Sequence, residues 1–285
     1  MRRIFLLCLL SLTAAGARAA DGEKPPKLDW KAGPVEVELG SLAKEKVPKG
    51  AIFANAADAR KLMEHFGNRT DGSELGLIAS DVEGQNWFII FEKREVGFIK
   101  DDDKNNIDAD AILKSITDAT EESNEERKKN GEGPLHVKGW KIAPHYEQST
   151  HHLVWAMLAD SDGHEIVNYN IRMLGREGYV SATFVDSSSN FDQAAPRLKE
   201  SLDGFTFSSG HSYAEWRPGD KVAQYGLTAL VAAGAGAAAV KLGLFAMLAK
   251  VLAKAWKAVA LGLGAVATWI RRFFKKKDAR PDLQP

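Results

Sequence analysis

A run of 25 residues, from Tyr225 to Ala249, is apolar or small except for Lys241. As a helix with a rise of 1.5 Å per residue it would extend about 37 Å, enough for one tilted crossing of a hydrocarbon layer of about 30 Å. The sequence therefore predicts a transmembrane helix over residues 225–249. Its Gly/Ala-rich part includes Gly234 and Gly236, and small residues let helices pack closely in lipid. Both self-association and a helix without a partner fit this composition.

The next segment, residues 250–277, is basic and only partly apolar. Its apolar stretch from Ala258 to Ile270 has 13 residues, too few for a full span. Two interpretations stay open: a basic helix associated with the membrane surface, or a second membrane helix. The positive-inside rule favours the first, because a return span would place the basic residues 271–277 outside. Residues 225–277 are thus expected to contact the lipid bilayer, and residues 278–285 to form a disordered tail.

The N-terminus has the layout of a secretory signal. Arg2 and Arg3 precede an apolar stretch from Ile4 to Leu12, and a small-residue cleavage site ends at Ala19. We expect residues 1–19 to be a signal peptide, with the general secretory and twin-arginine routes both open. Cys8, the only cysteine, would be removed with it, so the mature chain would contain no disulfide, thiolate metal site or Cys nucleophile. The predicted location is the bacterial inner membrane, with the soluble domain outside the cytoplasm.

Charge is distributed unevenly along a chain whose formal net charge is +0. Residues 20–221 carry a net charge of −11, whereas residues 222–285 carry +8. An acidic body argues against nucleic acid as a partner, because neutralising phosphates requires clustered Lys and Arg. The basic C-terminal part suits an anionic membrane surface.

The soluble domain is expected over residues 28–210, after a linker at 20–27 and before a juxtamembrane linker at 211–224. Strict alternation in Val35–Leu39 predicts a strand, and residues 44–54 form a second extended stretch broken by Pro48-Lys49-Gly50. Asn55 is a helix cap for residues up to Phe66, and Asp108 or Asn106 caps a helix over 109–129. A closing helix is expected from about 191 to 202, before Phe205-Thr206-Phe207.

The remaining patterns indicate strands. Trp87–Phe91 and Val96–Ile99 flank the polar residues 92–95 and predict a hairpin. Four more strands are expected at about 136–143, 151–159, 164–174 and 178–185, with a tight turn at Ser161-Asp162-Gly163. Hairpin-connected strands with helices inserted in blocks indicate an α+β fold, with an antiparallel sheet and flanking helices.

Signals of chemistry are weak. No serine lies in a Gly-x-Ser-x-Gly elbow, and no loop has the pattern that cradles phosphates. The acidic run at Asp101 resembles half a calcium loop but lacks the bidentate Glu, and His136, His145 and His164 lack a zinc-site spacing. We therefore expect no cofactor, no metal and no catalytic residue.

The motifs of the soluble domain resemble a known bacterial family. They are Trp30 with Gly33-Pro34, Gly67-Asn68, Gly97-Phe98-Ile99-Lys100-Asp101-Asp102, Asn124 with Arg127, Gly139-Trp140, Trp155-Ala156, Asn168-Tyr169-Asn170, Leu174-Gly175-Arg176 and Tyr225-Gly226-Leu227. From about residue 28 into the membrane segment the chain resembles the membrane-anchored proteins of domain-of-unknown-function family 2167. The resemblance implies export and anchoring but no established activity. The helix and Phe-rich strand that end the domain also resemble the fold of the photosystem oxygen-evolving-complex P subunits, a fold-level analogy that implies little about function.

A polar cluster is the candidate interaction or structural site. Asn124 and Arg127 share a helix face, and Asp101, Asp102 and Arg176 are candidates to meet them through Arg–carboxylate pairs. The alternative is a structural role, in which Arg127 and Arg176 only tie the long helix to the sheet. That role would explain the presence of the same residues.

The whole pattern indicates a membrane-anchored envelope protein that binds or supports other components. Its partner would be an envelope protein or, through the Gly/Ala-rich helix, a second copy. The alternative is a tethered hydrolase or metal-binding protein, with His145, His151 or His152 acting beside Asp101 or Asp102.

Overall fold

A computed structural model describes residues 26–66, 68, 70–82, 85, 87–129, 133–161 and 163–233. The predicted signal peptide, most of the 20–27 linker and everything after Ala233 lie outside these residues. All described residues belong to one compact unit that extends to Val240.

Eleven strands and four α-helices make up the described part of the chain. In order they are β1 Lys31–Ala32, β2 Val35–Leu39, β3 Ala43–Val47, β4 Ala51–Asn55, α2 Ala56–His65, β5 Glu74–Ser80, β6 Phe88–Arg94, α3 Ala109–Lys129, β7 Leu135–Glu147, β8 His152–Ser161, β9 His164–Leu174, β10 Tyr179–Ser187, α4 Ser188–Leu202, β11 Thr206–Phe207, the 3₁₀ turn η1 Tyr213–Glu215 and α5 Leu227–Ala233.

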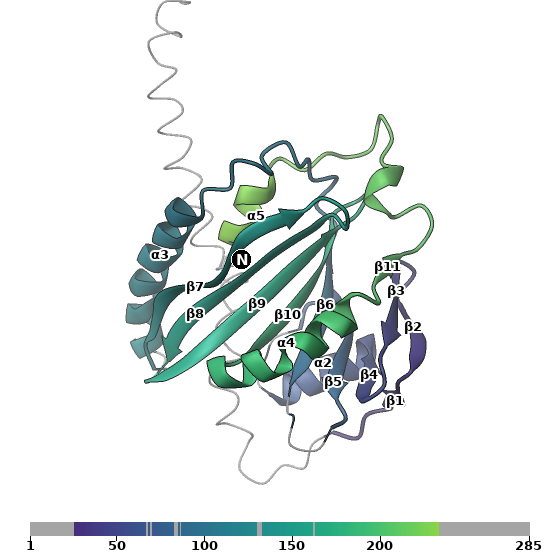
Figure 1. The fold of residues 1–285 in the computed structure, drawn as a ribbon, viewed down its shortest axis with the longest axis horizontal. Helices are drawn as coiled ribbons and strands as arrows, with labels where there is room; N and C mark the ends of the chain where they lie inside the picture. The colour runs from purple at the N-terminus through teal and green to yellow at the C-terminus, as the bar shows by residue number, and fades with distance from the viewer. Residues whose placement is uncertain are drawn as a thin grey trace, which may run out of the picture. The chain divides into compact units, whose positions relative to one another are not determined.

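Two antiparallel sheets organise these elements (Figure 1). The large sheet has eight strands in the order β1-β4-β5-β6-β10-β9-β8-β7, and the small sheet has the order β11-β3-β2. The prediction of an α+β fold with an antiparallel sheet and flanking helices is confirmed.

The helices begin where side chains satisfy their first free N–H groups. The Asn55 side chain accepts hydrogen bonds from the amides of Ala57 and Asp58, and Ser187 accepts one from Asn190. Asp108 accepts one from Ala111 at 2.9 Å, so of the two caps considered for α3 it is Asp108 that acts. The helix predictions at 56–66 and 109–129 are confirmed, and α4 begins three residues earlier than predicted.

The predicted hairpin within residues 87–99 is wrong. Strand β6 runs straight through Glu92 to Arg94 and pairs with β5 on one side and β10 on the other. Residues 96–99 form only a bridge, between Phe98 and Val222. The polar residues read as a turn are instead inside a strand, because Glu92 has Ser181 of β10 as its cross-strand neighbour.

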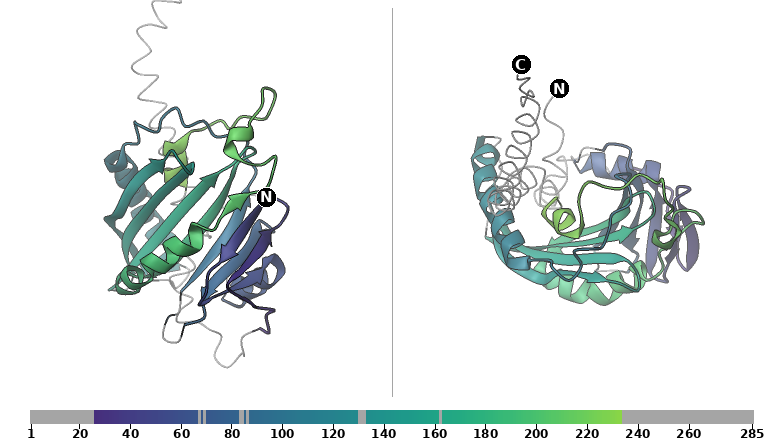
Figure 2. Two further views of the ribbon diagram at one scale, coloured as in Figure 1. Left: turned by 45° about the vertical axis from the view of Figure 1, so that its right-hand side comes forward. Right: turned by 90° about the horizontal axis from the view of Figure 1, so that it is seen from above.

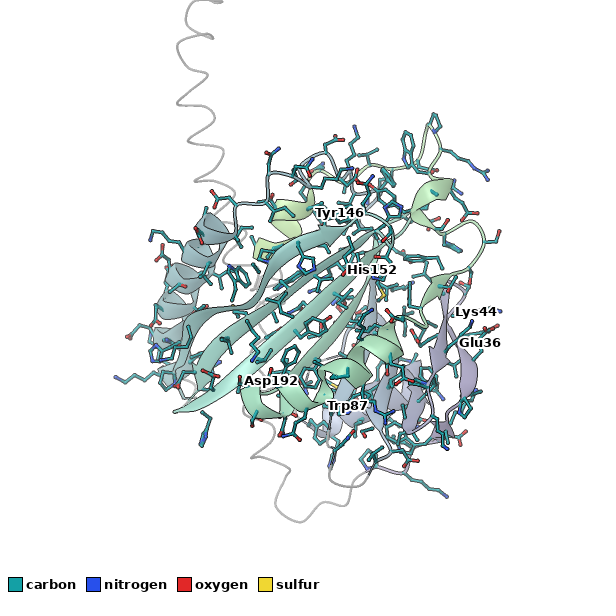
Figure 3. The ribbon with its side chains drawn as sticks, viewed as in Figure 1. Glu36, Lys44, Trp87, Tyr146, His152 and Asp192 are labelled. Carbon is teal, nitrogen blue, oxygen red and sulfur yellow. The ribbon has the colours of Figure 1, made fainter. Side chains whose placement is uncertain are left out.

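The extended stretch at 44–54 divides between the sheets. β3 pairs with β2 and β11, whereas β4 pairs with β1 and β5. Figure 3 shows Lys44 and Glu36 side by side on β3 and β2, where their side chains form an ion pair of 3.2 Å. Strand β5 was not predicted, since its sequence lacks alternation.

The large sheet is covered on both faces, with α4 against one and α5 against the other (Figure 2). On the α4 side Phe191 packs between Tyr169 and Phe184, with ring centroids at 5.5 and 5.8 Å. On the opposite side Leu153 and Trp155 of β8 pack in one cluster with α3 and α5.

The beginning of the predicted membrane helix lies in this second cluster. Leu227, Leu230 and Val231 of α5 are at most 1% exposed and pack with Ile112 and Ile116 of α3. Among the described residues, no helix combines the length and apolar character that a membrane crossing needs. Residues 227–233 are therefore part of the domain core in this structure.

Candidate functional site

A cleft of about 710 Å³ opens at one end of the large sheet. It lies where β6 and β9 end, β10 begins, and the β2–β3 turn meets the segment from Phe207 to Lys221. Its volume is within the range of small-molecule sites, about 300–1,000 Å³. The walls combine apolar side chains with charged groups of both signs: Leu42, Leu75, Lys93, Arg94, Glu95, Arg176, Glu177, Tyr179, Phe207, His211, Asp220 and Lys221.

Arg176, one of the predicted site residues, lies in this wall with its guanidinium engaged. Its Nε and Nη2 donate to the two carboxylate oxygens of Asp220 at 2.7 and 2.8 Å, and Nη1 donates to the Gly210 carbonyl at 3.3 Å. These bonds lower the pKa of Asp220 to about 2. Arg176 thus fastens the predicted 211–224 linker to the β9–β10 turn, and not the long helix to the sheet.

Glycines let the backbones of the cleft approach one another. A Cβ on Gly175 would lie 2.8 Å from both the His211 carbonyl oxygen and the Phe207 ring. Gly97 has φ of +100°, and a Cβ there would lie 2.8 Å from the Lys221 carbonyl oxygen. Both glycines belong to the family-like motifs, and their role here is to seat the 207–223 segment.

Asp101 and Asp102 do not line the cleft. Asp101 pairs with Lys104 at 3.1 Å. Asp102 lines a smaller hollow with Lys100 and Asp103, and Asp103 accepts hydrogen bonds from the amides of Leu227 and Thr228 at the start of α5.

Asn124 and Arg127 lie toward the far end of α3. The side chain of Asn124 both donates to and accepts from the main chain of Leu135, at 2.9 Å each, and Arg127 Nε donates to the Gly133 carbonyl at 2.8 Å. Fifteen residues along a helix separate Asn124 from the start of α3 by about 22 Å. The structure therefore separates the predicted cluster: Arg176 lines the cleft, Asp101 and Asp102 lie in the loop before α3, and Asn124 and Arg127 tie α3 to the start of β7.

A second group of side chains surrounds His151, between β7 and β8. Its Nδ1 lies 2.8 Å from the Tyr146 hydroxyl, and its ring stacks on Tyr213 with centroids 4.3 Å apart. Burial lowers the pKa of His151, although the charge of Asp101 opposes this, so the imidazole is neutral at pH 7. The backbone of His151 has a φ of 56°, in the left-handed region that residues other than glycine seldom adopt.

The other histidines do not join it. His145 contacts the Ala143 carbonyl at 3.0 Å. His152 begins β8, at the same end of the sheet as Tyr146 (Figure 3), and has Glu147 of β7 as its cross-strand neighbour. His136 contacts Glu121 at 2.8 Å. In the described ranges the one set of three metal-type ligands is Asp71, Glu74 and Glu92. Arg94 lies 3.5 Å from Asp71 and 3.3 Å from Glu92, so this set is an ion-pair network.

Sequence reasoning missed Asp220, Tyr146 and Tyr213. Tyr213 and Asp220 both lie in the segment 211–224, for which the sequence holds a signal. Ser212-Tyr213-Ala214-Glu215 has the spacing of a capping box. Glu215 accepts from the Ser212 hydroxyl and the Gly210 amide, and its pKa is lowered to about 2.

Fold and site define an α+β domain, built on a twisted antiparallel sheet, with a cleft at one sheet end. The chain belongs to the family of proteins of unknown function designated DUF2167, which it matches over residues 31–264. No curated protein matches it. Among solved structures it is similar to the solution structure of cyanobacterial PsbP (CyanoP) from Synechocystis sp. PCC 6803. The identity is 10%, the TM-score is 0.35, and the match covers 66% of this chain and 96% of that one.

Proposed function

We propose that this protein is an exported, membrane-tethered binding module whose ligand occupies the cleft beside Arg176. The observation that carries the proposal is the cleft itself. It has the volume of a ligand site and combines apolar Leu42 and Phe207 with charges of both signs. Export and tethering are inferred from the N-terminal signal pattern and the apolar run of residues 225–249.

A ligand screen on the full chain in lipid nanodiscs tests this function. Compounds of varied charge and polarity would be ranked by the increase in melting temperature that binding produces. Ser41→Trp places a large ring at an exposed position of the cleft wall, and Ser41→Ala is its matched control. Binding should fail in the first variant and survive in the second. A compound that stabilises the Ser41→Trp protein as strongly as the wild type would show that the cleft is not its site.

The second candidate is a hydrolase, and the specific observation that favours it is the contact of a neutral His151 with Tyr146. An imidazole that is unprotonated at pH 7 is suited to general-base catalysis. His151→Ala should then abolish turnover of ester or phosphoester substrates, while His145→Ala, which alters an exposed histidine outside this group, should not. Turnover unaffected by His151→Ala, or absent from the wild type over a broad panel, would exclude this candidate.

A further inference from the structure

The segment 225–233 takes part in two structures that require it in different places. In sequence it forms the first nine of the 25 apolar residues that predict a membrane span. In the fold the same segment provides Leu227, Leu230 and Val231 to the core beneath α3. The two roles exclude each other, because side chains buried against Ile112 and Ile116 cannot face lipid.

The length of the apolar run that remains after α5 shows why the two locations of residues 225–233 matter. With residues 225–233 held in the domain, the apolar run retains only residues 234–249, 16 positions that include Lys241. A helix of that length extends about 24 Å, less than the roughly 30 Å of a hydrocarbon core. A span with the predicted bounds, residues 225–249, therefore needs α5.

The three buried aliphatic side chains of α5 would meet a similarly apolar environment in either location. Lipid chains are about as apolar as leucine side chains, so moving three aliphatic residues from the core to a bilayer changes their solvation little. What holds α5 in the domain specifically is Asp103. Its carboxylate accepts from the Leu227 amide, the Thr228 amide and the Thr228 hydroxyl, at 3.0, 3.0 and 2.8 Å.

We propose that α5 exchanges between the groove beneath α3 and the bilayer, released when the Asp103 cap breaks. The proposal rests on the membrane tether of the proposed function. When α5 leaves, it uncovers the apolar side chains of Ile116, Leu153 and Trp155, which now share its cluster. The membrane would thus control access to a surface that the docked form keeps closed.

Lipids that carry a photoreactive group on the acyl chain test this exchange without altering α5. The full chain is reconstituted in vesicles, irradiated and digested, and adducts are mapped by mass spectrometry. Adducts are expected on residues 227–233 as well as beyond Ala233. Asp103→Ala should increase the yield on 227–233 several-fold, whereas Asp102→Ala, which alters a neighbouring exposed carboxylate, should leave it unchanged.

The outcomes separate the exchange from the tether. Adducts confined to residues after Ala233, in the wild type and in Asp103→Ala, would overturn the exchange and leave the tether intact. Equal yields on 227–233 in the two proteins would show that the cap does not control release, and would also overturn the proposal. Failure of the wild-type chain to float with vesicles would refute the tether itself. If Asp103→Ala does not fold, the wild-type adducts alone decide.

Discussion

The two faces of the large sheet are both buried but differ in chemistry. On the α4 face the strands present side chains such as Val167, Ile171 and Phe184, each at most 4% exposed. On the opposite face the intervening positions of β9 are Asn168, Asn170 and Arg172, which are also nearly buried. The sheet is thus apolar on the α4 side, whereas on the other side the apolar residues of β8 lie next to a row of polar residues on β9.

The polar row is internally satisfied. Arg172 donates to Asn170 Oδ1 at 3.1 Å, and Asn170 donates in turn to Asn168. The guanidinium lies over the Trp155 ring, 4.9 Å from its centroid. Ser181, the cross-strand neighbour of both Arg172 and Glu92, donates to the Glu92 carbonyl at 3.3 Å. Hydrogen bonds among neighbours are what allow polar side chains to be buried at acceptable cost.

The largest expected effect tests the apolar face. Phe184→Ala removes a ring that is 1% exposed, and should lower the free energy of unfolding by about 3–5 kcal/mol. The adjacent Thr183→Ala is the matched change on the polar face and should cost about 1 kcal/mol, since Thr183 makes one long hydrogen bond to Asn170. Urea denaturation of the full chain in detergent measures both. Equal losses would contradict the division between the faces.

The second prediction concerns an exception on the apolar side, Glu45 of β3. It is 0% exposed, and within the described residues neither carboxylate oxygen has a hydrogen-bond partner. Burial raises its pKa from 4.5 to about 9, so the folded protein holds the acid neutral at pH 7. Because the pKa is raised, the contribution of Glu45 to stability is greatest below pH 4.5 and is lost as the pH rises toward 9.

Between pH 5 and 7.5 this loss should be on the order of 3 kcal/mol. Glu45→Gln keeps the shape without the titrating proton, so it should flatten the dependence and stabilise the protein at pH 7.5. Glu38→Gln, which changes an exposed carboxylate of β2, is the control. A wild-type stability that does not fall over this pH range would contradict the assignment of a neutral Glu45.

The third prediction tests the polar row. Arg172→Met preserves much of the side-chain volume but removes the donor to Asn170 and the cation over Trp155, and should cost about 2 kcal/mol. Arg172→Lys retains the charge and should lose less. If Arg172→Met is as stable as the wild type, the polar row of β9 does not contribute to the stability of the fold. Such a result has precedent, because well-packed apolar residues can replace buried charges without loss of stability.

The smallest effect is expected at the cleft, where the Arg176–Asp220 pair is only partly covered. Arg176→Ala should lower the melting temperature less than Phe184→Ala, Thr183→Ala or Arg172→Met, and Asp220→Asn should add little to it in the double variant. Because the pKa of Asp220 is lowered to about 2 from 3.8, its contribution is present above pH 4 and disappears as the pH falls through 2. Additive losses at pH 7 would show that the pair is not coupled.

The sequence predicts those elements whose pattern is local. The turn signal Ser161-Asp162-Gly163 separates β8 from β9 correctly, and Asn55 and Asp108 start their helices as expected. Contacts between distant residues are not encoded in this way. Glu92 belongs to a polar stretch that indicates a turn when only its neighbours in sequence are considered. The residue that pairs with it in the sheet, Ser181, lies 89 positions away. Arg176 and Gly175 attract notice, but nothing near them indicates Asp220, 44 positions along.

The attachment of the 211–224 segment has a mechanical consequence. Phe98 donates to the Lys221 carbonyl and accepts from the Ala223 amide, at 2.8 and 2.9 Å, and Asp103 holds Leu227 a few residues later. A pull on the chain beyond Ala233 would load the packing of Leu230 and Val231 first, then the Asp103 bonds, and then the two Phe98 bonds. Lys221 belongs to the wall of the cleft, so tension on the C-terminal segment would reach that wall with no slack between them.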